Sequence, residues 1–524
     1  MVGLMYPHRL TLNPLPRDLH AHLVSLITSG ASDRIAVEAP FDGRTIIGQV
    51  PEGGQACVDK AFSVARQAQC SWADTPHALR RSIFHRFHAS VLEHRELLMD
   101  MVQLETGKNR AAAFDEVMDV ASTAHYYART AEKLLKPQRR QGTIPGLSST
   151  FEHHYPLGVV GQISPWNYPL TLAISDAIPA LLAGNAVVSK PDSKTAFTSL
   201  LVISLLYDAG LPRELFQTVT GEGAVVGGAI AEQCDYLMFT GSTDTGRILG
   251  ETAGRRLIGF SAELGGKNPL IVAEDADLDV AVDGAIHGTL SNSGQLCVSI
   301  ERIYVVGAVY RAFLDAYVEG LRNTRIGAGF DWNMEMGTLA SQQQLDNVRD
   351  MVDDAVSKGA EVLCGGKPRP DLGPYFYEPT VITGATEDME LYRNEVFGPV
   401  VYVEVVEDLA EAIVRANDTD YGLNAAIFAA PATARAAAPL IHAGGVNIND
   451  AYSATWANVD TPLGGAKDSG LSARHGAVGL LKYTQVQNIS EQRFLQLRGP
   501  RSLKRKTYAA ILTPALQILA RIRK

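Results

Sequence analysis

Cys297 and Glu263 together could perform covalent chemistry on a carbonyl carbon. Cys297 ends the run Ser-Gly-Gln-Leu-Cys, in which Gly294 leaves the backbone beside the thiol uncrowded, and Glu263 begins the run Glu-Leu-Gly-Gly-Lys. A thiol can attack an aldehyde, and a carboxylate can activate the water that later releases the acyl group. A lone cysteine is more often an inert small side chain, and a lone glutamate is more often a surface charge. The hypothesis therefore rests on the two runs together.

An amide side chain completes this set of reactive groups. Asn167 follows Trp166 in the run Gly-Gln-Ile-Ser-Pro-Trp-Asn-Tyr-Pro. Its N–H could donate to the oxyanion that forms when a thiolate adds to an aldehyde, together with the backbone N–H of Cys297. Taken alone, an asparagine between two prolines is more simply an Asx turn.

A glycine-serine turn could bind a dinucleotide. Gly241 and Ser242 follow a short apolar run and begin an expected helix, in which Gly246 permits close packing. Free N–H groups at a helix N-terminus can bind a pyrophosphate. No GxGxxG fingerprint opens a βαβ unit here. Arg247 and Ile248 replace the Lys and Ser/Thr of a P-loop, which excludes nucleoside triphosphate hydrolysis.

Composition favours a cytoplasmic globular enzyme. The length of 524 residues suggests about three domains, and a hydrophobic fraction of 46% allows large cores. The net charge of -10 and the pI near 5.7 do not indicate the basic surface that nucleic-acid binding requires. The five cysteines form neither a disulfide framework nor a zinc-ligand pair, and we expect no metal site. His153 and His154 lack further ligands at metal spacing. We see no secretory signal and no apolar run long enough to span a membrane.

The order of elements predicts two α/β domains. Helical patterns fill 54–69 and 76–136, and the alternating charges of 93–110 suggest solvated helix faces. Short apolar runs then alternate with helical stretches, which is typical of parallel strands with crossover helices. The first group comprises the runs near 158–165, 185–191, 215–221, 234–241 and 268–274. The second comprises the runs near 302–307, 361–366, 377–384, 397–406, 425–430 and 444–449.

Three segments fit neither group. The stretches 142–156 and 482–493 are each expected to form a lone strand. From Arg498 to Lys524 there are eight basic residues and no acidic ones, and apolar residues recur at helical spacing, although Pro514 would kink the helix. This basic amphipathic helix is expected to dock on its own protein or on a neighbouring subunit, with weak contact to a membrane surface as the alternative.

The cysteine and glutamate runs resemble the signatures of the aldehyde dehydrogenase superfamily, and the similarity continues through most of the chain. The resemblance implies an α/β, aldehyde dehydrogenase-like fold with two Rossmann-like α/β domains and a small β oligomerisation flap. The cofactor-binding domain would comprise 1–140 and 158–264, and the catalytic domain 265–465. The flap would comprise 141–157 and 482–495, and the basic tail 498–524. A homodimer or homotetramer is implied.

The same resemblance assigns roles to individual residues. Cys297 would form a thiohemiacetal and then a thioester, Glu263 would activate the hydrolytic water, and Asn167 would stabilise the oxyanion. The residues implied in cofactor binding are Trp166, Asn167, Lys190, Pro191, Asp192, Ser193, Gly241, Ser242, Leu264 and Glu395, with Phe397 near the nicotinamide.

Ser193 and Lys194 favour NADP, with NAD as the alternative. Many NAD-preferring members of the superfamily have a glutamate at the position of Ser193, where it accepts from the ribose 2'-hydroxyl. Removing that carboxylate and adding an ammonium should admit a 2'-phosphate.

The chain most resembles a bacterial succinate-semialdehyde dehydrogenase branch, which implies oxidation of succinate semialdehyde to succinate. Some members of that branch clamp the distal carboxylate with two arginines, and this chain has Ser175 and Ser291 at those positions. Backbone N–H groups and hydroxyls of 449–461 would then hold the acid, with Arg302 either as a cation for it or only as a support of the loop.

Tyr452 and Trp456 instead suit apolar or aromatic aldehydes, or they could be loop anchors. A broad-specificity dehydrogenase is therefore the alternative function. An inactive structural homologue is the rival from another class, and the presence of Cys297, Glu263 and Asn167 together argues against it.

Overall fold

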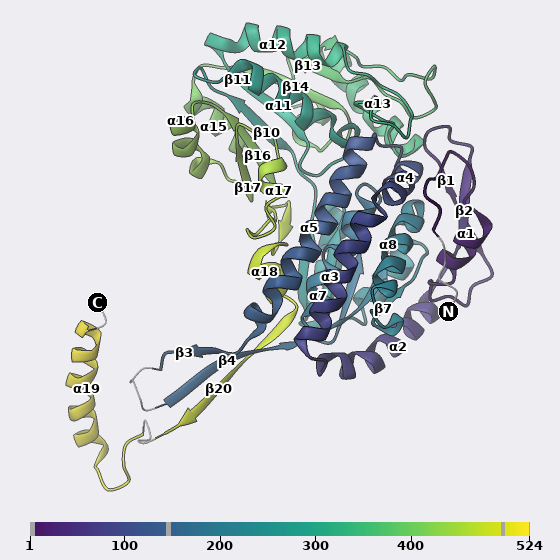
Figure 1. Cartoon of the computed structure of the whole chain (residues 1–524). Helices are drawn as coiled ribbons and strands as arrows, with labels where there is room; N and C mark the ends of the chain where they lie inside the picture. The colour runs from purple at the N-terminus through teal and green to yellow at the C-terminus, as the bar shows by residue number, and fades with distance from the viewer. Residues whose placement is uncertain (1–5, 143–147, 494–497, 523–524) are drawn as a thin grey trace.

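Two parallel sheets covered by helices form the body of the chain, and a ribbon of strands projects from it (Figure 1). This computed structural model describes residues 6–142, 148–493 and 498–522. Within those residues, no helix is long and apolar enough to cross a membrane.

The first sheet has six strands in the order β19-β9-β8-β5-β6-β7. Its members are β5 (Val159–Ile163), β6 (Ala186–Lys190), β7 (Phe216–Thr218), β8 (Tyr236–Thr240), β9 (Gly259–Glu263) and β19 (Gly470–Leu471). All pairs are parallel except β19 on β9. The strands β5 and β6 are buried along their whole length, because helices cover both faces of the sheet. This burial explains why they appear in the sequence as continuous apolar runs.

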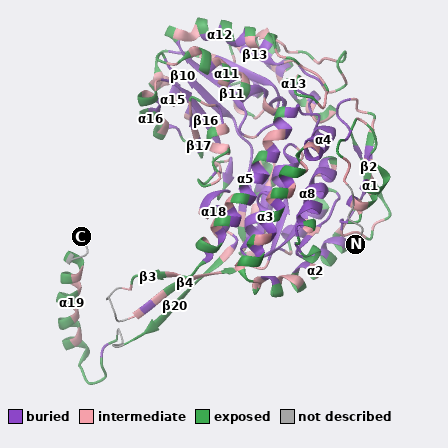
Figure 2. Cartoon of the chain, viewed as in Figure 1, coloured by how far each residue is buried: buried purple, intermediate pink, exposed green. Residues whose placement is uncertain are grey.

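Long helices cover this sheet: α2 (Gln55–Ala73), α3 (His77–Glu93), α4 (Arg95–Thr106), α5 (Arg110–Leu135), α6 (Pro169–Ile174), α7 (Ala177–Leu182), α8 (Ala196–Asp208), α9 (Gly228–Ala231) and α10 (Thr243–Arg256). The interpretation of 93–110 as solvated helix faces is wrong from Leu97 onwards, although 93–96 are exposed or half-buried. Every residue of α4 from Leu97 to Thr106 is buried, and so are Lys108 and Arg110 (Figure 2). The charges there lie in ion pairs between packed helices, a pattern that sequence periodicity does not distinguish from a surface helix.

The second sheet has seven strands in the order β12-β13-β14-β11-β10-β16-β17. They are β10 (Asn268–Val272), β11 (Ile300–Val306), β12 (Glu361–Cys364), β13 (Thr380–Thr383), β14 (Val400–Val406), β16 (Asn424–Phe428) and β17 (Gly445–Ile448). The run near 268–274, grouped above with the first set of strands, belongs to this second sheet, where β10 pairs with β11 and β16. The strands β9 and β10 are adjacent in sequence, so the Gly-Gly turn between them connects the two sheets.

Helices of the second half are α11 (Leu278–Leu290), α12 (Gly307–Arg322), α13 (Gln342–Ser357), α14 (Glu390–Arg393), α15 (Leu409–Asn417), α16 (Pro431–Ala437), α17 (Ser453–Trp456) and α18 (Gly476–Leu481). The sequence analysis did not identify α1 (Arg17–Val24), the hairpin of β1 (Arg34–Glu38) and β2 (Ile46–Pro51), or the small pair of β15 (Tyr421–Gly422) and β18 (Ala466–Lys467).

The projecting ribbon is a three-stranded sheet of β3 (Gln138–Arg140), β4 (Ser148–Pro156) and β20 (Thr484–Gln492). The two segments expected to be lone strands pair antiparallel with each other, from Ser148 opposite Gln492 to Pro156 opposite Thr484. Parts of the expected flap, 143–147 and 494–495, lie outside the described residues, as do 523–524 of the tail. The helix α19 (Arg505–Ile522) follows, with Pro514 inside it, and lies beyond the ribbon in Figure 1.

Candidate active site

A cavity of about 580 Å³ lies between the two sheets. Its lining includes ten of the residues singled out above, which come from both halves of the chain: Trp166, Asn167, Gly241, Ser242, Glu263, Leu264, Cys297, Glu395, Phe397 and Trp456. The ends of β8 and β9 supply one side, and the segments before β11 and β14 supply the other. The fold therefore brings together groups that lie far apart in the sequence.

Cys297 follows a strained stretch of backbone. Three successive residues, Asn292, Ser293 and Gly294, have φ of 51°, 56° and 73°. This left-handed conformation is uncommon for non-glycine residues. A Cβ atom at Gly294 would lie 2.0 Å from the carbonyl oxygen of Gly398, so only glycine fits there. Burial, and then the carboxylates of Glu395 and Glu263, raises the pKa of Cys297 to about 12. The thiol of the free chain is therefore protonated at neutral pH.

Glu263 lies at the end of β9, facing the same cavity. Its carboxylate is buried, and Oε1 has no hydrogen-bond partner within the described residues. Burial raises the pKa of Glu263 to about 7, although the cations Arg474 and Lys482 oppose the shift. A carboxylate with this pKa can accept a proton from a thiol or from water near neutral pH. Gly266 is required by packing, since a Cβ atom there would lie 2.5 Å from the backbone carbonyl oxygen of Cys297.

A buried cluster of charges beside Glu263 was not identified from sequence. Arg474 lines the cavity and pairs with Asp176, and Lys482 lies 3.4 Å from the other oxygen of Asp176. The Nε atom of Arg474 is buried without a hydrogen-bond partner among the described residues. Asp176 lies 298 residues before Arg474, so no local spacing shows that these charges pair. Arg474 reaches the site because β19 pairs with β9 and directs the following segment along the cavity.

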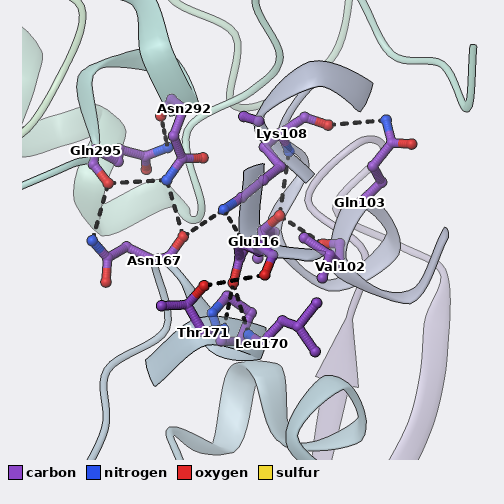
Figure 3. Close-up of polar contacts among 12 residues, drawn as sticks. Val102, Gln103, Lys108, Glu116, Asn167, Leu170, Thr171, Asn292 and Gln295 are labelled. Atoms are coloured by element: carbon purple, nitrogen blue, oxygen red, sulfur yellow. Dashed lines mark hydrogen bonds and ion pairs between the residues drawn. The ribbon is translucent and has the colours of Figure 1, made fainter. Parts of the chain in front are cut away.

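Hydrogen bonds hold Asn167 through both its side-chain amide and its backbone carbonyl. Its side-chain Nδ2 donates to the carbonyl of Gln295 at 3.1 Å, in the segment just before Cys297. Its backbone carbonyl accepts from Lys108 Nζ at 2.7 Å and from Asn292 Nδ2 at 3.0 Å (Figure 3). The second N–H of the Asn167 amide makes no hydrogen bond to another described residue. This arrangement can present one amide N–H to a reacting oxygen beside the thiol.

The residues implied in cofactor binding occupy two adjoining places. Gly241 and Ser242 lie at the N-terminus of α10, where the Ser242 side chain caps the helix, and a Cβ atom at Gly246 would approach Leu264 to 2.6 Å. Lys190 ends β6, two strands from β8, and Pro191, Asp192 and Ser193 follow it; none of the four is among the residues that line the cavity. Lys190 is almost wholly buried, and burial lowers its pKa. Because β6 and β8 run parallel, Lys190 and the N-terminus of α10 lie at the same edge of the sheet, which suits a bound dinucleotide phosphate and ribose.

A second ion pair fixes the segment that carries Glu395 and Phe397. Glu301 accepts from the backbone N–H groups of Val396 and Phe397 at 2.9 Å each, and from Lys267 Nζ at 2.6 Å. Phe397 itself has a left-handed backbone, with φ of 55°, and its ring meets Trp166 edge-on at 5.6 Å. Glu395 accepts from the N–H of Gly266 at 2.9 Å. The Glu395 carboxylate therefore faces the cavity from a fixed backbone.

Most of the residues expected to select the aldehyde do not face the cavity. Arg302 is buried on β11 and donates to the carbonyls of Lys267 and Ala416, so its expected role as a substrate cation is wrong. Ser175 donates to Asp119, and Ser291 accepts from the hydroxyl of the buried Tyr452. Trp456, by contrast, lines the cavity. Tyr452 is a packing anchor of its loop, stacked on His287, because its aromatic ring fills the core of the second sheet.

Comparison with known proteins gives concordant results. Residues 27–489 match a family model described as the aldehyde dehydrogenase family. The "putative succinate-semialdehyde dehydrogenase (NADP(+))" of Mycolicibacterium smegmatis is 51% identical over 501 residues, covering 95% of this chain and 97% of that protein. The "putative succinate-semialdehyde dehydrogenase (NADP(+)) 2" of Mycobacterium tuberculosis is 47% identical, and the match covers 93% of this chain and 94% of that protein. Betaine aldehyde dehydrogenase from Staphylococcus aureus, solved with NAD+, is 32% identical with a TM-score of 0.85, covering 91% and 98%.

Proposed function

The chain belongs to the aldehyde dehydrogenase family, and we propose that it oxidises succinate semialdehyde to succinate with NADP+. Aldehyde oxidation follows from the family. The substrate is proposed because two relatives that match the chain over more than nine-tenths of its length carry that name. The observation that most supports the chemistry is the convergence of Cys297, Glu263 and Asn167 on one cavity.

Each of the three residues has a distinct task in the proposed reaction. The thiol of Cys297 loses its proton to solvent water, and the sulfur bonds to the aldehyde carbon. The resulting oxyanion accepts hydrogen bonds from the Asn167 amide and the backbone N–H of Cys297. Bound NADP+ supplies the acceptor for the hydride, which leaves an acyl thioester on Cys297. Glu263, with its pKa near neutrality, then takes a proton from a second water, and the oxygen of that water bonds to the acyl carbon. The C–S bond breaks, the sulfur takes the proton back from Glu263, and the acid is released.

The ribose site supports the preference for NADP. Ser193 lies in the turn after β6 with its hydroxyl bonded to the carbonyl of Gly221, and Lys194 beside it is exposed. No carboxylate occupies position 193, so a 2'-phosphate meets an ammonium rather than a like charge. The M. smegmatis relative is named for NADP(+), whereas the S. aureus structure contains NAD+, and NAD remains the second cofactor that we propose.

Arg474 is the group that we propose for the distal carboxylate of the substrate. It is the only lysine or arginine among the residues lining the cavity, and its Nε donor has no partner in the described part of the chain. A buried guanidinium attracts a carboxylate strongly because little water screens the charges. The rest of the lining contains apolar side chains, including Leu172, Leu296 and Trp456, which suit the short carbon chain of the aldehyde.

The test compares succinate semialdehyde with butanal, a neutral aldehyde of equal chain length. We expect catalytic efficiency on the acid to exceed that on butanal by roughly tenfold or more, because a substrate carboxylate that the enzyme binds contributes a few kcal/mol to the binding free energy. Arg474→Gln should remove most of this difference, because the lost charge raises KM for the acid only, whereas the accompanying rise in the pKa of Glu263 affects the two aldehydes equally. Equal efficiency on the two aldehydes in the unaltered enzyme would contradict the substrate assignment. It would favour the broad dehydrogenase for apolar or aromatic aldehydes, which the apolar lining and Trp456 also suit.

We further propose that the ribbon of β4 and β20 mediates assembly into a dimer or tetramer. Phe151, Tyr155 and Ile489 are exposed, and Phe151 and Ile489 are directly opposite each other on one face of the ribbon. Exposed apolar residues of this kind typically mark contact surfaces. The tail helix also exposes apolar residues, including Ile511 and Ile518, and docks on a neighbouring subunit in this proposal. Weak attraction of its basic residues to an anionic membrane surface is the second role we propose.

A further inference from the structure

Lys108 and Glu116 form a buried ion pair that contacts the backbone of Asn167, the residue proposed to stabilise the oxyanion. The side chains of both residues are wholly buried, and Nζ lies 2.6 Å from Glu116 Oε1. The same Nζ donates to the carbonyl of Asn167 at 2.7 Å (Figure 3) and lies 3.8 Å from the centre of the Tyr168 ring. Lys108 is not among the residues lining the cavity, so it does not meet the substrate.

Local structure directs Lys108 inward. The helix α4 ends at Gly107, which has φ of 73°, and a Cβ atom there would lie 2.0 Å from Thr338 Oγ1. This left-handed residue turns the chain, so that Lys108 enters the core before α5 begins. The side-chain amide of Gln103 donates to the backbone carbonyl of Lys108 at 3.2 Å and further fixes the turn.

Glu116 ties the same pair to the segment after Asn167. Its Oε2 accepts from the backbone N–H of Leu170 at 2.8 Å and from that of Thr171 at 3.1 Å, at the start of α6. Asn167 is thus held through its own carbonyl by Lys108, while the next turn of chain is held by Glu116. A buried lysine and glutamate are costly to keep charged unless both are paired and hydrogen-bonded, and here both are.

Through the carbonyl of Asn167, the Lys108–Glu116 pair is also linked to the backbone segment that precedes Cys297. Asn292 Nδ2 donates to the Asn167 carbonyl and, at 2.9 Å, to the carbonyl of Gln295. The carbonyl of Asn167 therefore receives one hydrogen bond from the helical side and one from the strained loop that precedes Cys297. A shift of this carbonyl moves the oxyanion amide relative to the sulfur.

We propose that Lys108, anchored by Glu116, is a positioning residue that holds the Asn167 amide in register with Cys297. The inference rests on the oxyanion role proposed for Asn167. It predicts that loss of Lys108 slows the chemical steps without weakening cofactor binding. A displacement of about 1 Å at such an amide can cost on the order of a hundredfold in rate.

A double-mutant cycle tests this with the full-length enzyme. We expect Lys108→Met to lower kcat for succinate semialdehyde by roughly 10- to 100-fold, with the Kd for NADP+ unchanged. In an Asn167→Ala background, the same change should lower kcat by less than about threefold, because no amide is left to position. Equal factors in the two backgrounds would overturn the proposal while leaving the role of Asn167 intact. If Asn167→Ala alone left kcat unchanged, the oxyanion role would fail, and the positioning proposal with it.

Arg110 provides the matched control. It is also buried, lies two residues beyond Lys108, and pairs with Asp100 and Glu96, but it makes no contact with Asn167. Arg110→Met should lower the thermal midpoint and combine additively with Asn167→Ala. If Arg110→Met coupled to Asn167→Ala as strongly as Lys108→Met does, the coupling would reflect a general loss of core packing, and the proposal would be overturned. Should Lys108→Met fail to fold, Glu116→Gln enters the same cycle, because it retains an acceptor for Leu170 and Thr171 while weakening the anchor of Lys108. Additive behaviour of Glu116→Gln would overturn the proposal equally.

Discussion

On the side of the cavity formed by the six-stranded sheet, a buried lysine fixes the backbone, whereas on the side of the seven-stranded sheet a buried glutamate does. Lys108 donates to the carbonyl of Asn167, and Glu301 accepts from the N–H groups of Val396 and Phe397. Each is paired at 2.6 Å with a partner of opposite charge, Glu116 or Lys267.

The difference follows from what each side presents to the substrate. The Asn167 side offers an amide N–H, so its segment is held through a carbonyl and the donor remains available. The Glu395 side offers a carboxylate and an aromatic ring, so its segment can be held through backbone N–H groups. A buried lysine–glutamate pair thus holds a backbone carbonyl on one side and backbone N–H groups on the other. The choice leaves the Asn167 amide free on the first side and the Glu395 carboxylate free on the second.

The largest expected effect comes from removing the nucleophile, which both sides serve. Cys297→Ala should lower dehydrogenase activity on the order of 10⁴-fold or more, since no other cysteine is among the described residues that line the cavity. Cofactor binding, followed by calorimetry, should persist because the thiol does not hold the dinucleotide. Turnover near that of the unaltered enzyme would remove Cys297 from the mechanism.

The next effect concerns the base on the six-stranded side. Glu263→Gln should slow steady-state turnover by roughly 100-fold or more, while a first turnover of NADPH still appears in stopped-flow absorbance. The unaltered enzyme should release its acyl group faster as pH rises through about 7, because Glu263 accepts a proton only when ionised. A deacylation rate that falls with pH, or the same pH dependence in the glutamine variant, would assign the base elsewhere.

A smaller effect is expected on the opposite side. Glu301→Gln weakens the hydrogen bonds to Val396 and Phe397 and leaves Lys267 without its counter-charge. We expect KM for NADP+ to rise by roughly tenfold, because charge-assisted hydrogen bonds contribute about 1.5–3 kcal/mol. Combination with Asn167→Ala should be additive, in contrast to Lys108→Met. Strong coupling between Glu301 and Asn167 would show that the two sides are not independent.

The smallest effect concerns the ribose turn, which lies outside both sides. Ser193→Glu should lower the preference for NADP over NAD by roughly tenfold, because a carboxylate repels the 2'-phosphate. Ser193→Ala serves as the control, since it removes the bond to the Gly221 carbonyl without adding charge. An unchanged ratio of catalytic efficiencies in the glutamate variant would show that this turn does not read the 2'-position.

Local patterns in the sequence predicted the two parallel sheets, because strands buried on both faces appear as apolar runs. Short motifs also predicted the family fold and the cavity groups Cys297, Glu263 and Asn167. The supporting charges were missed for a physical reason. Lys108 lies in a segment whose charges resemble those of a surface helix, and only tertiary packing shows that they are buried and paired. Arg474 was missed because strand pairing, not spacing, brings it to Glu263.

The central claim is that Cys297 carries the acyl group and Glu263 releases it. Mass spectrometry of Glu263→Gln, mixed with NADP+ and succinate semialdehyde, tests this most directly, with Cys297→Ala treated in the same way. We predict one succinyl group per chain on the peptide that contains Cys297, and none on the alanine variant. An absence of any adduct during the stalled turnover, or an adduct on a different peptide, would contradict the account.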